Sequence, residues 1–162
     1  MRGEILSLLP QLRGFARFLT GQPAQADDLV QETVLRALAA LDQFAPGTSM
    51  KAWLYTIARN LFYEQRRHGQ RERDVMSDYA HRPDQPESGT GEGEADVLRD
   101  LDGAIWQLSS RLREALVLVG VQEMTYAEAA HVCGVTVGTI KARVSRARAQ
   151  IMEYMNARPD DG

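Results

Sequence analysis

The sequence predicts an all-α protein made of two small helical domains joined by a flexible acidic linker. Apolar residues recur every three or four positions in both halves, and no segment shows the alternation of a strand. Residues 81–96 hold two prolines, three glycines and many acids but no large apolar side chain, so they cannot bury enough surface to fold. The 162 residues suffice for two small domains. We expect these at 1–73 and 97–162, with the linker at 74–96.

The first half is expected to contain three helices, with room for a short fourth. A Gly-Gln-Pro sequence ends the first helix at residues 21–23, and the second helix begins near Ala24. A break at residues 44–48 follows, and Thr48 or Ser49 can cap the third helix. The apolar stripes of the three helices are Ile5, Leu8, Leu9, Leu12, Phe15 and Leu19; then Leu29, Val30, Val34, Leu38 and Leu41; then Trp53, Leu54, Ile57, Ala58, Leu61 and Phe62.

The second half begins with two helical runs, at 97–107 and 110–121, and then shows a pattern typical of a helix-turn-helix. Thr125 and Glu128 have the spacing of a capping box, in which each residue satisfies a backbone N–H of the other. The helix that follows is short and rich in small residues. Gly134 supplies the positive φ that a tight turn between helices needs.

The helix after this turn has one apolar face and one basic, polar face. Residues 136–150 contain four basic residues and no acid, and Thr136 can cap the helix. A helix of this kind can enter a DNA major groove. The alternative is an ordinary helical hairpin whose basic side meets only water. The residues expected to contact DNA are Thr136, Thr139, Lys141, Arg143, Ser145 and Arg146.

The distribution of charge supports a nucleic-acid partner although the net charge is −3. Residues 74–102 hold nine acids against two arginines, whereas residues 59–73 hold five arginines against two acids. Two basic clusters are therefore separated by an acidic spacer, a layout that the net charge conceals.

The sequence lacks the features that define several other classes of protein. The single cysteine, Cys133, provides no disulfide framework, suits a reducing cytosol, and is expected to be a small buried residue rather than a redox switch. The three histidines are scattered, and no phosphate-binding loop or nucleophile elbow occurs, so we expect no enzyme activity, cofactor or metal site. No segment approaches the ~20 apolar residues of a membrane span and no signal peptide is evident, so we expect a cytoplasmic protein.

Three motifs together resemble one family. Three segments are similar to those of extracytoplasmic-function (ECF) sigma factors of the sigma-70 family. They are Ala-Asp-Asp-Leu-Val-Gln-Glu-Thr at 26–33, Pro-Gly-Thr-Ser-Met-Lys-Ala-Trp-Leu-Tyr-Thr-Ile-Ala-Arg-Asn at 46–60, and residues 134–148. Residues 128–134, Glu-Ala-Ala-His-Val-Cys-Gly, further resemble the EcfG-type subgroup of the general stress response. The resemblance covers nearly the whole chain except the linker.

The resemblance implies that 1–73 is sigma region 2 and 97–162 is sigma region 4. It implies that the helix near residues 26–33 docks on the β′ clamp helices of core RNA polymerase, and that region 4 meets the β flap. The alternative for Asp27 and Asp28 is that they only complement the helix dipole. The residues implied to bind the polymerase are Asp28, Gln31, Glu32 and Arg36.

The resemblance also implies that the loop at 44–50 and the helix that follows it melt and read the −10 promoter element, and that the helix-turn-helix reads the −35 element. Arg59, Arg66 and Arg67 are candidates for phosphate contacts, whereas Trp53 is expected in the core. Glu64 and the Phe62-Tyr63 pair depart from the usual pattern, so the −10 sequence preference does not carry over. The residues implied to bind −10 DNA are Lys51, Arg59, Asn60, Tyr63, Arg66 and Arg67.

Two further implications concern regulation. The acidic linker threads toward the active-site cleft of the polymerase in this family, and the alternative is a solvated tether. Members of the EcfG-type subgroup are held inactive by an anti-sigma factor of the NepR type. Two other functions are alternatives: a sigma-like decoy that captures an anti-sigma factor, and a one-component helix-turn-helix regulator. The second leaves the motifs at 26–33 and 46–60 unexplained.

Overall fold

A computed structural model describes residues 2–72 and 92–157, and these are helical with short connections and no strand. Residues 73–91, most of the predicted linker, and residues 158–162 lie outside the described part of the chain. The elements in order are α1 (Arg2–Thr20), α2 (Pro23–Ala39), a 3-10 turn η1 (Leu41–Gln43), α3 (Met50–Glu72), α4 (Glu92–Gln107), α5 (Ser110–Leu116), a π-helical turn η3 (Val117–Val121), α6 (Tyr126–Cys133) and α7 (Val137–Ala157). The predicted all-α fold is confirmed.

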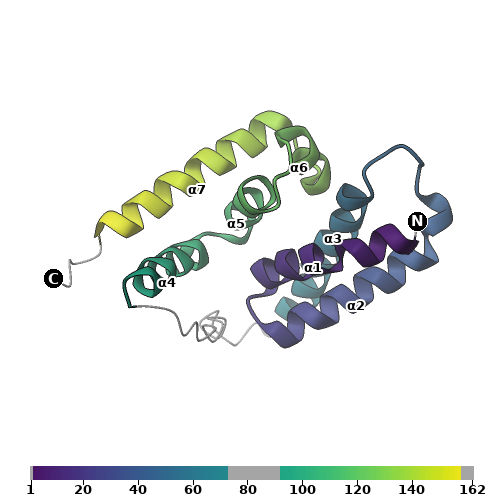
Figure 1. Ribbon diagram of the computed structural model, residues 1–162, viewed down its shortest axis with the longest axis horizontal. Helices are drawn as coiled ribbons and strands as arrows, with labels where there is room; N and C mark the ends of the chain where they lie inside the picture. The colour runs from purple at the N-terminus through teal and green to yellow at the C-terminus, as the bar shows by residue number, and fades with distance from the viewer. Residues whose placement is uncertain (1, 73–91, 158–162) are drawn as a thin grey trace.

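Helices α1, α2 and α3 form a three-helix bundle (Figure 1), because each has an apolar stripe that needs two neighbours to cover it. Leu12, Phe15 and Leu54 are completely buried at its centre. The Tyr55 ring stacks on Phe15 with 4.7 Å between ring centroids. At the start of α3 the Ser49 hydroxyl accepts a hydrogen bond from the backbone N–H of Ala52 at 3.1 Å, so Ser49 is the cap.

The helix-turn-helix forms as the sequence predicts. The Thr125 hydroxyl accepts from the backbone N–H of Glu128, and the Glu128 carboxylate accepts from the backbone N–H of Thr125, which completes the capping box. Gly134 ends α6 with φ +68°, in the left-handed region that favours glycine. The Thr136 hydroxyl then accepts from the backbone N–H of Thr139 at the start of α7. These local signals fix the angle at which α7 leaves α6.

The two halves of the chain share one hydrophobic core. Buried residues of η3, α6 and α7, including Leu118, Val132 and Ile140, belong to the same packed cluster as Phe15 and Tyr55 of the bundle. Helix α6 packs against α3, and α5 packs against α1, so the second half lies directly on the first (Figure 1). One face of α3 is therefore covered by the helix-turn-helix half.

Two boundaries differ from the sequence prediction. Helix α4 begins at Glu92, inside the segment predicted as linker; acidic residues suit the first turn of a helix, so acidic composition alone does not exclude one. The run expected to be helical over 110–121 changes at Val117 to a π-helical turn, in which the N–H of Gln122 bonds to the carbonyl of Val117 at 2.8 Å. Glu123 follows with φ +58°. No helix in the described ranges is both long and apolar enough to cross a membrane.

Candidate nucleic-acid interface

The residues predicted to bind the polymerase lie together on the outer side of α2. Asp28, Gln31 and Arg36 are exposed, and Glu32 is partly exposed. Glu32 and Arg36 form an ion pair at 3.3 Å across one helical turn, of a kind worth only a few tenths of a kcal/mol. The same side of α2 exposes large apolar side chains as well, namely Leu35 and Leu38, at 63% and 41% exposure. A mixed apolar and charged surface of this kind suits a protein partner.

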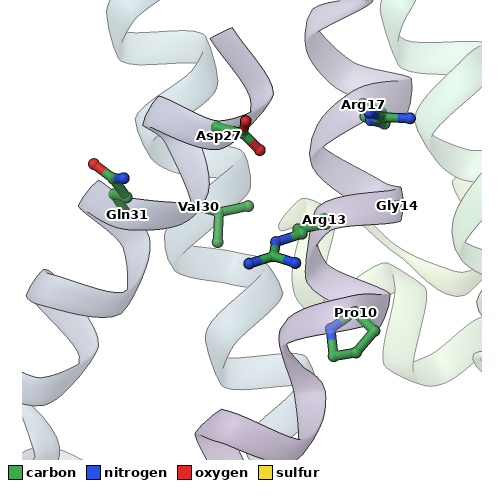
Figure 2. Close-up of a pocket in the computed structure, with 7 residues that line it drawn as sticks. All are labelled: Pro10, Arg13, Gly14, Arg17, Asp27, Val30 and Gln31. Carbon is green, nitrogen blue, oxygen red and sulfur yellow. The ribbon is translucent and has the colours of Figure 1, made fainter. Parts of the chain in front are cut away.

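A groove of about 770 Å³ runs between α1 and α2 beside this surface. Figure 2 shows Arg13 reaching from α1 toward α2, with Asp27 and Gln31 on the opposite side. Arg13 and Arg17 are exposed, and within residues 2–72 and 92–157 neither forms a salt bridge. The groove therefore offers unpaired guanidinium groups next to Gln31.

Of the residues predicted to bind −10 DNA, three are open to solvent on α3. Asn60, Arg66 and Arg67 are exposed, and Arg66 is hydrogen-bonded to the hydroxyl of Ser110 in the other half. A shallow cavity of about 390 Å³ adjoins Arg66 and Arg67. Lys51, at the start of α3, donates from Nζ to the backbone carbonyl of Gln122 at 2.7 Å. Lys51 and Arg66 are thus engaged across the boundary between the halves.

Among the residues predicted to bind −10 DNA, Arg59 makes the most extensive contact with the second half of the chain. Its Nε donates to both oxygens of the Glu114 carboxylate, at 3.1 and 3.0 Å, and the two side chains are 11% and 0% exposed. Burial raises the pKa of Glu114, and Arg59 opposes that shift. Burial is the largest single influence on the pKa of Arg59 and lowers it, but the charge of Glu114 and its hydrogen bond, together with smaller contributions from Cys133 and Tyr63, raise the pKa overall. The pair is a buried ion pair that joins α3 to α5.

The ring of Tyr63 contacts the guanidinium groups of Arg59 and Arg111, whose Cζ atoms are 4.7 and 5.1 Å from its centroid. Burial raises the pKa of Tyr63, and the Glu114 charge adds to the shift. Its hydroxyl is buried and has no hydrogen-bond partner among the described residues. Tyr63 is thus packed under the other half of the chain. Trp53 is half-buried against the core and contacts Phe44 at 5.2 Å, in agreement with the prediction that it packs.

The residues predicted to contact −35 DNA are mostly exposed along α7. Thr136, Lys141, Ser145 and Arg146 are exposed, while Ile140 and Val144 on the opposite face are buried. The exceptions are Thr139 and Arg143, which are partly buried. Arg143 Nη1 is buried and without a hydrogen-bond partner in the described part of the chain. One side of α7 is therefore exposed to solvent, whereas Thr139 and Arg143 at the edge of that side are partly buried.

Cys133 is buried in the turn region at 4% exposure, as predicted for a packing residue. Burial raises the pKa of its thiol to about 12, and the nearby Glu114 charge adds to the shift. Such a thiol carries almost no thiolate near neutral pH, and the thiolate is the reactive form. In the described residues no group of His, Cys, Asp and Glu could hold a metal ion.

Sequence reasoning missed the residues that join the halves. Gln122 accepts from the Tyr55 hydroxyl at 2.6 Å and donates to the carbonyl of Gln11 at 3.3 Å. Arg113 donates to the carbonyl of Phe18 at 2.8 Å, and burial lowers its pKa to about 10. A signal for Glu114 was present: it shares a helical face with Val117 and Leu118, so it was placed where an apolar residue is expected.

Comparison with known families assigns the two halves to one class of protein. The family model "Sigma-70 region 2" matches residues 5–72, and "Sigma-70, region 4" matches residues 98–151. The chain belongs to the sigma-70 family and, with the relatives that follow, to its ECF RNA polymerase sigma factors. The resemblance stated from the three sequence motifs is thereby confirmed.

Individual relatives support the assignment to the ECF sigma factors. The chain is 44% identical to the ECF RNA polymerase sigma factor EcfG of Rhodopseudomonas palustris, over all of this chain and 90% of the relative. It is 39% identical to the sigma factor SigC of Mycobacterium tuberculosis over 84% of this chain and 72% of the relative. Among solved structures it is similar to the sigma factor RpoE of Bartonella quintana, in complex with the anti-sigma factor NepR, with a TM-score of 0.84, 39% identity and 97% of each chain covered.

Proposed function

We propose that this sigma factor directs promoter-specific initiation by reading the −10 element with α3 and the −35 element with α7, while α2 holds core RNA polymerase. Region 2 is proposed at 1–73 and region 4 at 97–162. The single observation that carries the proposal is that one chain contains two basic helices, α3 in the segment that matches sigma-70 region 2 and α7 in the segment that matches sigma-70 region 4. The polymerase supplies the chemistry, so no catalytic residue is proposed here.

The −35 assignment is supported by the exposure of α7. Lys141, Ser145 and Arg146 project from the side opposite its buried apolar face, so a duplex can approach without unfolding the helix. Lysine and arginine contact phosphates and base edges in the major groove. We assign Thr136, Thr139 and Arg143 to the edges of this surface.

The −10 assignment is supported by the outer part of α3. Asn60, Arg66 and Arg67 are exposed, and they combine an amide that can read a base edge with cations that can follow a phosphate backbone. Lys51, Arg59 and Tyr63 lie on the same helix but contact the second half, and they join this surface only when those contacts are released.

The polymerase contact is assigned to α2. Its outer side presents Asp28, Gln31, Glu32 and Arg36, and Leu35 and Leu38 add apolar area that a protein partner can bury. Region 4 is assigned to the β flap. The groove with Arg13 lies beside Gln31 and offers a cation to an acidic side chain of the same partner.

Regulation is proposed by analogy with the relatives. The chain resembles EcfG in sequence and RpoE in structure, and RpoE was solved with NepR. We propose an anti-sigma partner of the NepR type, control of stress-response promoters, and action in the cytoplasm, where core polymerase and the chromosome are found.

The test is run-off transcription with purified core polymerase and promoter fragments from the organism that carries this gene. The wild-type chain should yield a transcript only when core polymerase is present. Arg146→Ala should reduce that transcript, and Glu153→Gln, an exposed change near the end of the same helix, should not. Absence of a transcript from every fragment, with core polymerase shown to be active with another sigma factor, contradicts the proposal.

A further inference from the structure

Val137 is an apolar residue that the protein leaves exposed at the first position of α7. It continues the apolar pattern of Ile140 and Val144, which are buried on the later turns of the same helix. Val137 itself is 38% exposed. The packing that buries the later residues therefore does not cover Val137, and its side chain is free to meet a partner.

The polar residues beside Val137 are occupied in ending the helix. The hydroxyl oxygens of Thr136 and Thr139 are hydrogen-bonded to each other at 2.9 Å, and the Thr136 oxygen also accepts from the backbone N–H of Thr139 at 3.1 Å. Gly138 has no side chain, and a Cβ placed there would have only the Thr136 hydroxyl within 4 Å, at 3.9 Å. Within residues 136–139, Val137 is therefore the side chain best suited to an apolar contact outside the chain.

The end of α7 that carries Val137 is the end next to the turn, where α7 meets α6 (Figure 1). In a helix-turn-helix, the N-terminal residues of the second helix reach the base edges in the major groove. Lys141 and Ser145 follow Val137 at intervals of about one helical turn, and both are exposed, as is Arg146. Residues 136–150 include no acid that would repel phosphate. A duplex bound by Lys141 and Arg146 therefore brings base edges close to Val137.

The chemistry of a valine side chain selects one kind of base edge. The major groove displays hydrogen-bond donors and acceptors and one apolar group, the C5 methyl of thymine. Valine neither donates nor accepts a hydrogen bond, so its contact with an amino or carbonyl group leaves that group desolvated without a partner. Its contact with a methyl group instead removes apolar surface from water on both sides. Val137 thus favours thymine over the other bases at the position that it touches.

We propose that Val137 is a specificity-determining residue of the −35 surface, which packs against the C5 methyl group of a thymine and selects that base at one position. The inference rests on the proposed function of α7 and deepens it, because it names the chemical group on the DNA that one side chain reads. The cations of α7 hold the duplex, and Val137 distinguishes one base pair from the others.

The experiment removes the methyl groups from each side of the contact in turn. The holoenzyme formed by the full chain and core polymerase is bound to a promoter fragment that yields a transcript in the run-off assay. Each thymine of the −35 element, on either strand, is replaced singly by deoxyuridine, which lacks the C5 methyl but keeps the hydrogen-bonding groups of thymine. The Kd of each complex is measured at one fixed salt concentration, since DNA affinity depends strongly on salt.

At one thymine, deoxyuridine should weaken binding of the wild-type holoenzyme by ~4-fold, the change that corresponds to the loss of one buried methyl group, about 0.8 kcal/mol. Val137→Ala should weaken binding to the unmodified fragment by ~4-fold or more. For Val137→Ala, deoxyuridine at that same position should change the Kd by less than ~1.5-fold, because the methyl group has already lost its partner.

Two controls separate this effect from a change in folding. Alanine has a higher helix propensity than valine, so Val137→Ala should retain the circular dichroism spectrum and the thermal midpoint of the wild-type chain. Val121→Ala makes the same substitution at an exposed valine outside α7. Its holoenzyme should show the same ~4-fold effect of deoxyuridine as wild type.

Three results would overturn the inference. The first is that deoxyuridine has no effect at any position. The second is a −35 element without thymine on either strand. The third is a deoxyuridine effect that is equal for Val137→Ala and wild type at every position, because another group then reads the methyl.

Failure of this inference is distinguishable from failure of the proposed function. A transcript together with any of these three results leaves the sigma function in place and removes the role of Val137. Absence of a transcript from every fragment removes the assigned function and this inference with it.

Discussion

Replacing Tyr55 with phenylalanine removes one oxygen atom from the contact between the two halves. The Tyr55 hydroxyl is buried and donates to Gln122 Oε1 at 2.6 Å, and its ring stacks on Phe15. Phenylalanine keeps the ring and the stacking, so the change is confined to the hydrogen bond. We expect the contact between the halves to be destabilised, with no direct change to the apolar packing on either side of it.

The magnitude follows from what the substitution leaves behind. Gln122 is only 8% exposed, so its Oε1 loses its partner and gains no water while the halves stay together. An unsatisfied buried acceptor of this kind costs ~1–3 kcal/mol. Opening of the halves lets water reach Gln122 and recovers that cost. The population of open molecules should therefore rise by ~5- to ~150-fold.

The single cysteine reports the opening. Cys133 is buried within the core that both halves share, and burial raises the pKa of its thiol to about 12, so the closed state reacts slowly with iodoacetamide. When reclosing is fast, the rate of alkylation is proportional to the open population. Tyr55→Phe should therefore be alkylated faster than wild type at one fixed pH. The charges that act on Cys133 are those of Glu114, Arg59 and Arg143, so the change at Tyr55 does not alter the thiol directly.

Tyr154→Phe is the matched control, because Tyr154 is a tyrosine of α7 beside Gly103 of α4, away from the contact between the halves. Its alkylation rate should equal that of wild type. An alkylation rate for Tyr55→Phe that stays within experimental error of both would refute the reasoning that Gln122 joins the halves.

Four further predictions concern stability and DNA binding. Gly134→Ala should lower the free energy of unfolding by ~1–2 kcal/mol in urea denaturation, because φ +68° is strained for alanine although no atom lies within 4 Å to clash. An unchanged free energy of unfolding would contradict the left-handed conformation of Gly134 in this turn. Thr125→Ala should cost ~0.5–2 kcal/mol by loss of the capping box, measured in the same way. The free energy of unfolding should fall as pH rises from 9 toward 12, since the pKa of Cys133 is raised from 9.0 to about 12 and the folded state keeps a proton that the unfolded state loses; Cys133→Ala should lack this part of the decline. Arg146→Ala should weaken promoter binding by the holoenzyme and reduce the slope of log K against log salt by about 1, whereas an unchanged slope would remove Arg146 from the phosphate contacts.

The local elements of this fold could be predicted because their signals are short-range. The capping box at Thr125, the left-handed Gly134 and the Thr136 cap each depend on residues within one turn of helix. The boundary of α4 at Glu92 could not be predicted, because an acidic segment with glycine is compatible both with a linker and with the start of a helix.

The contact between the halves was beyond sequence reasoning. Arg59 and Glu114 are separated by 55 residues, and nothing in either local pattern identifies the other as its partner. The arginines of α3 led to a prediction of nucleic-acid contact, but a guanidinium that suits a phosphate also suits a carboxylate. The π-helical turn before Gln122 is likewise set by long-range packing, since the preceding residues alone are compatible with a continuous α-helix.

Site-specific photo-crosslinking in the complex with core polymerase and promoter DNA tests the central claim most directly. A photoreactive amino acid replaces Asn60 on α3 in one variant and Arg146 on α7 in another, both exposed positions. We expect the first to crosslink to the melted −10 strand and the second to the −35 duplex, at two separate places on one promoter. Crosslinks from both positions to the same place, or from neither to DNA, would contradict the account.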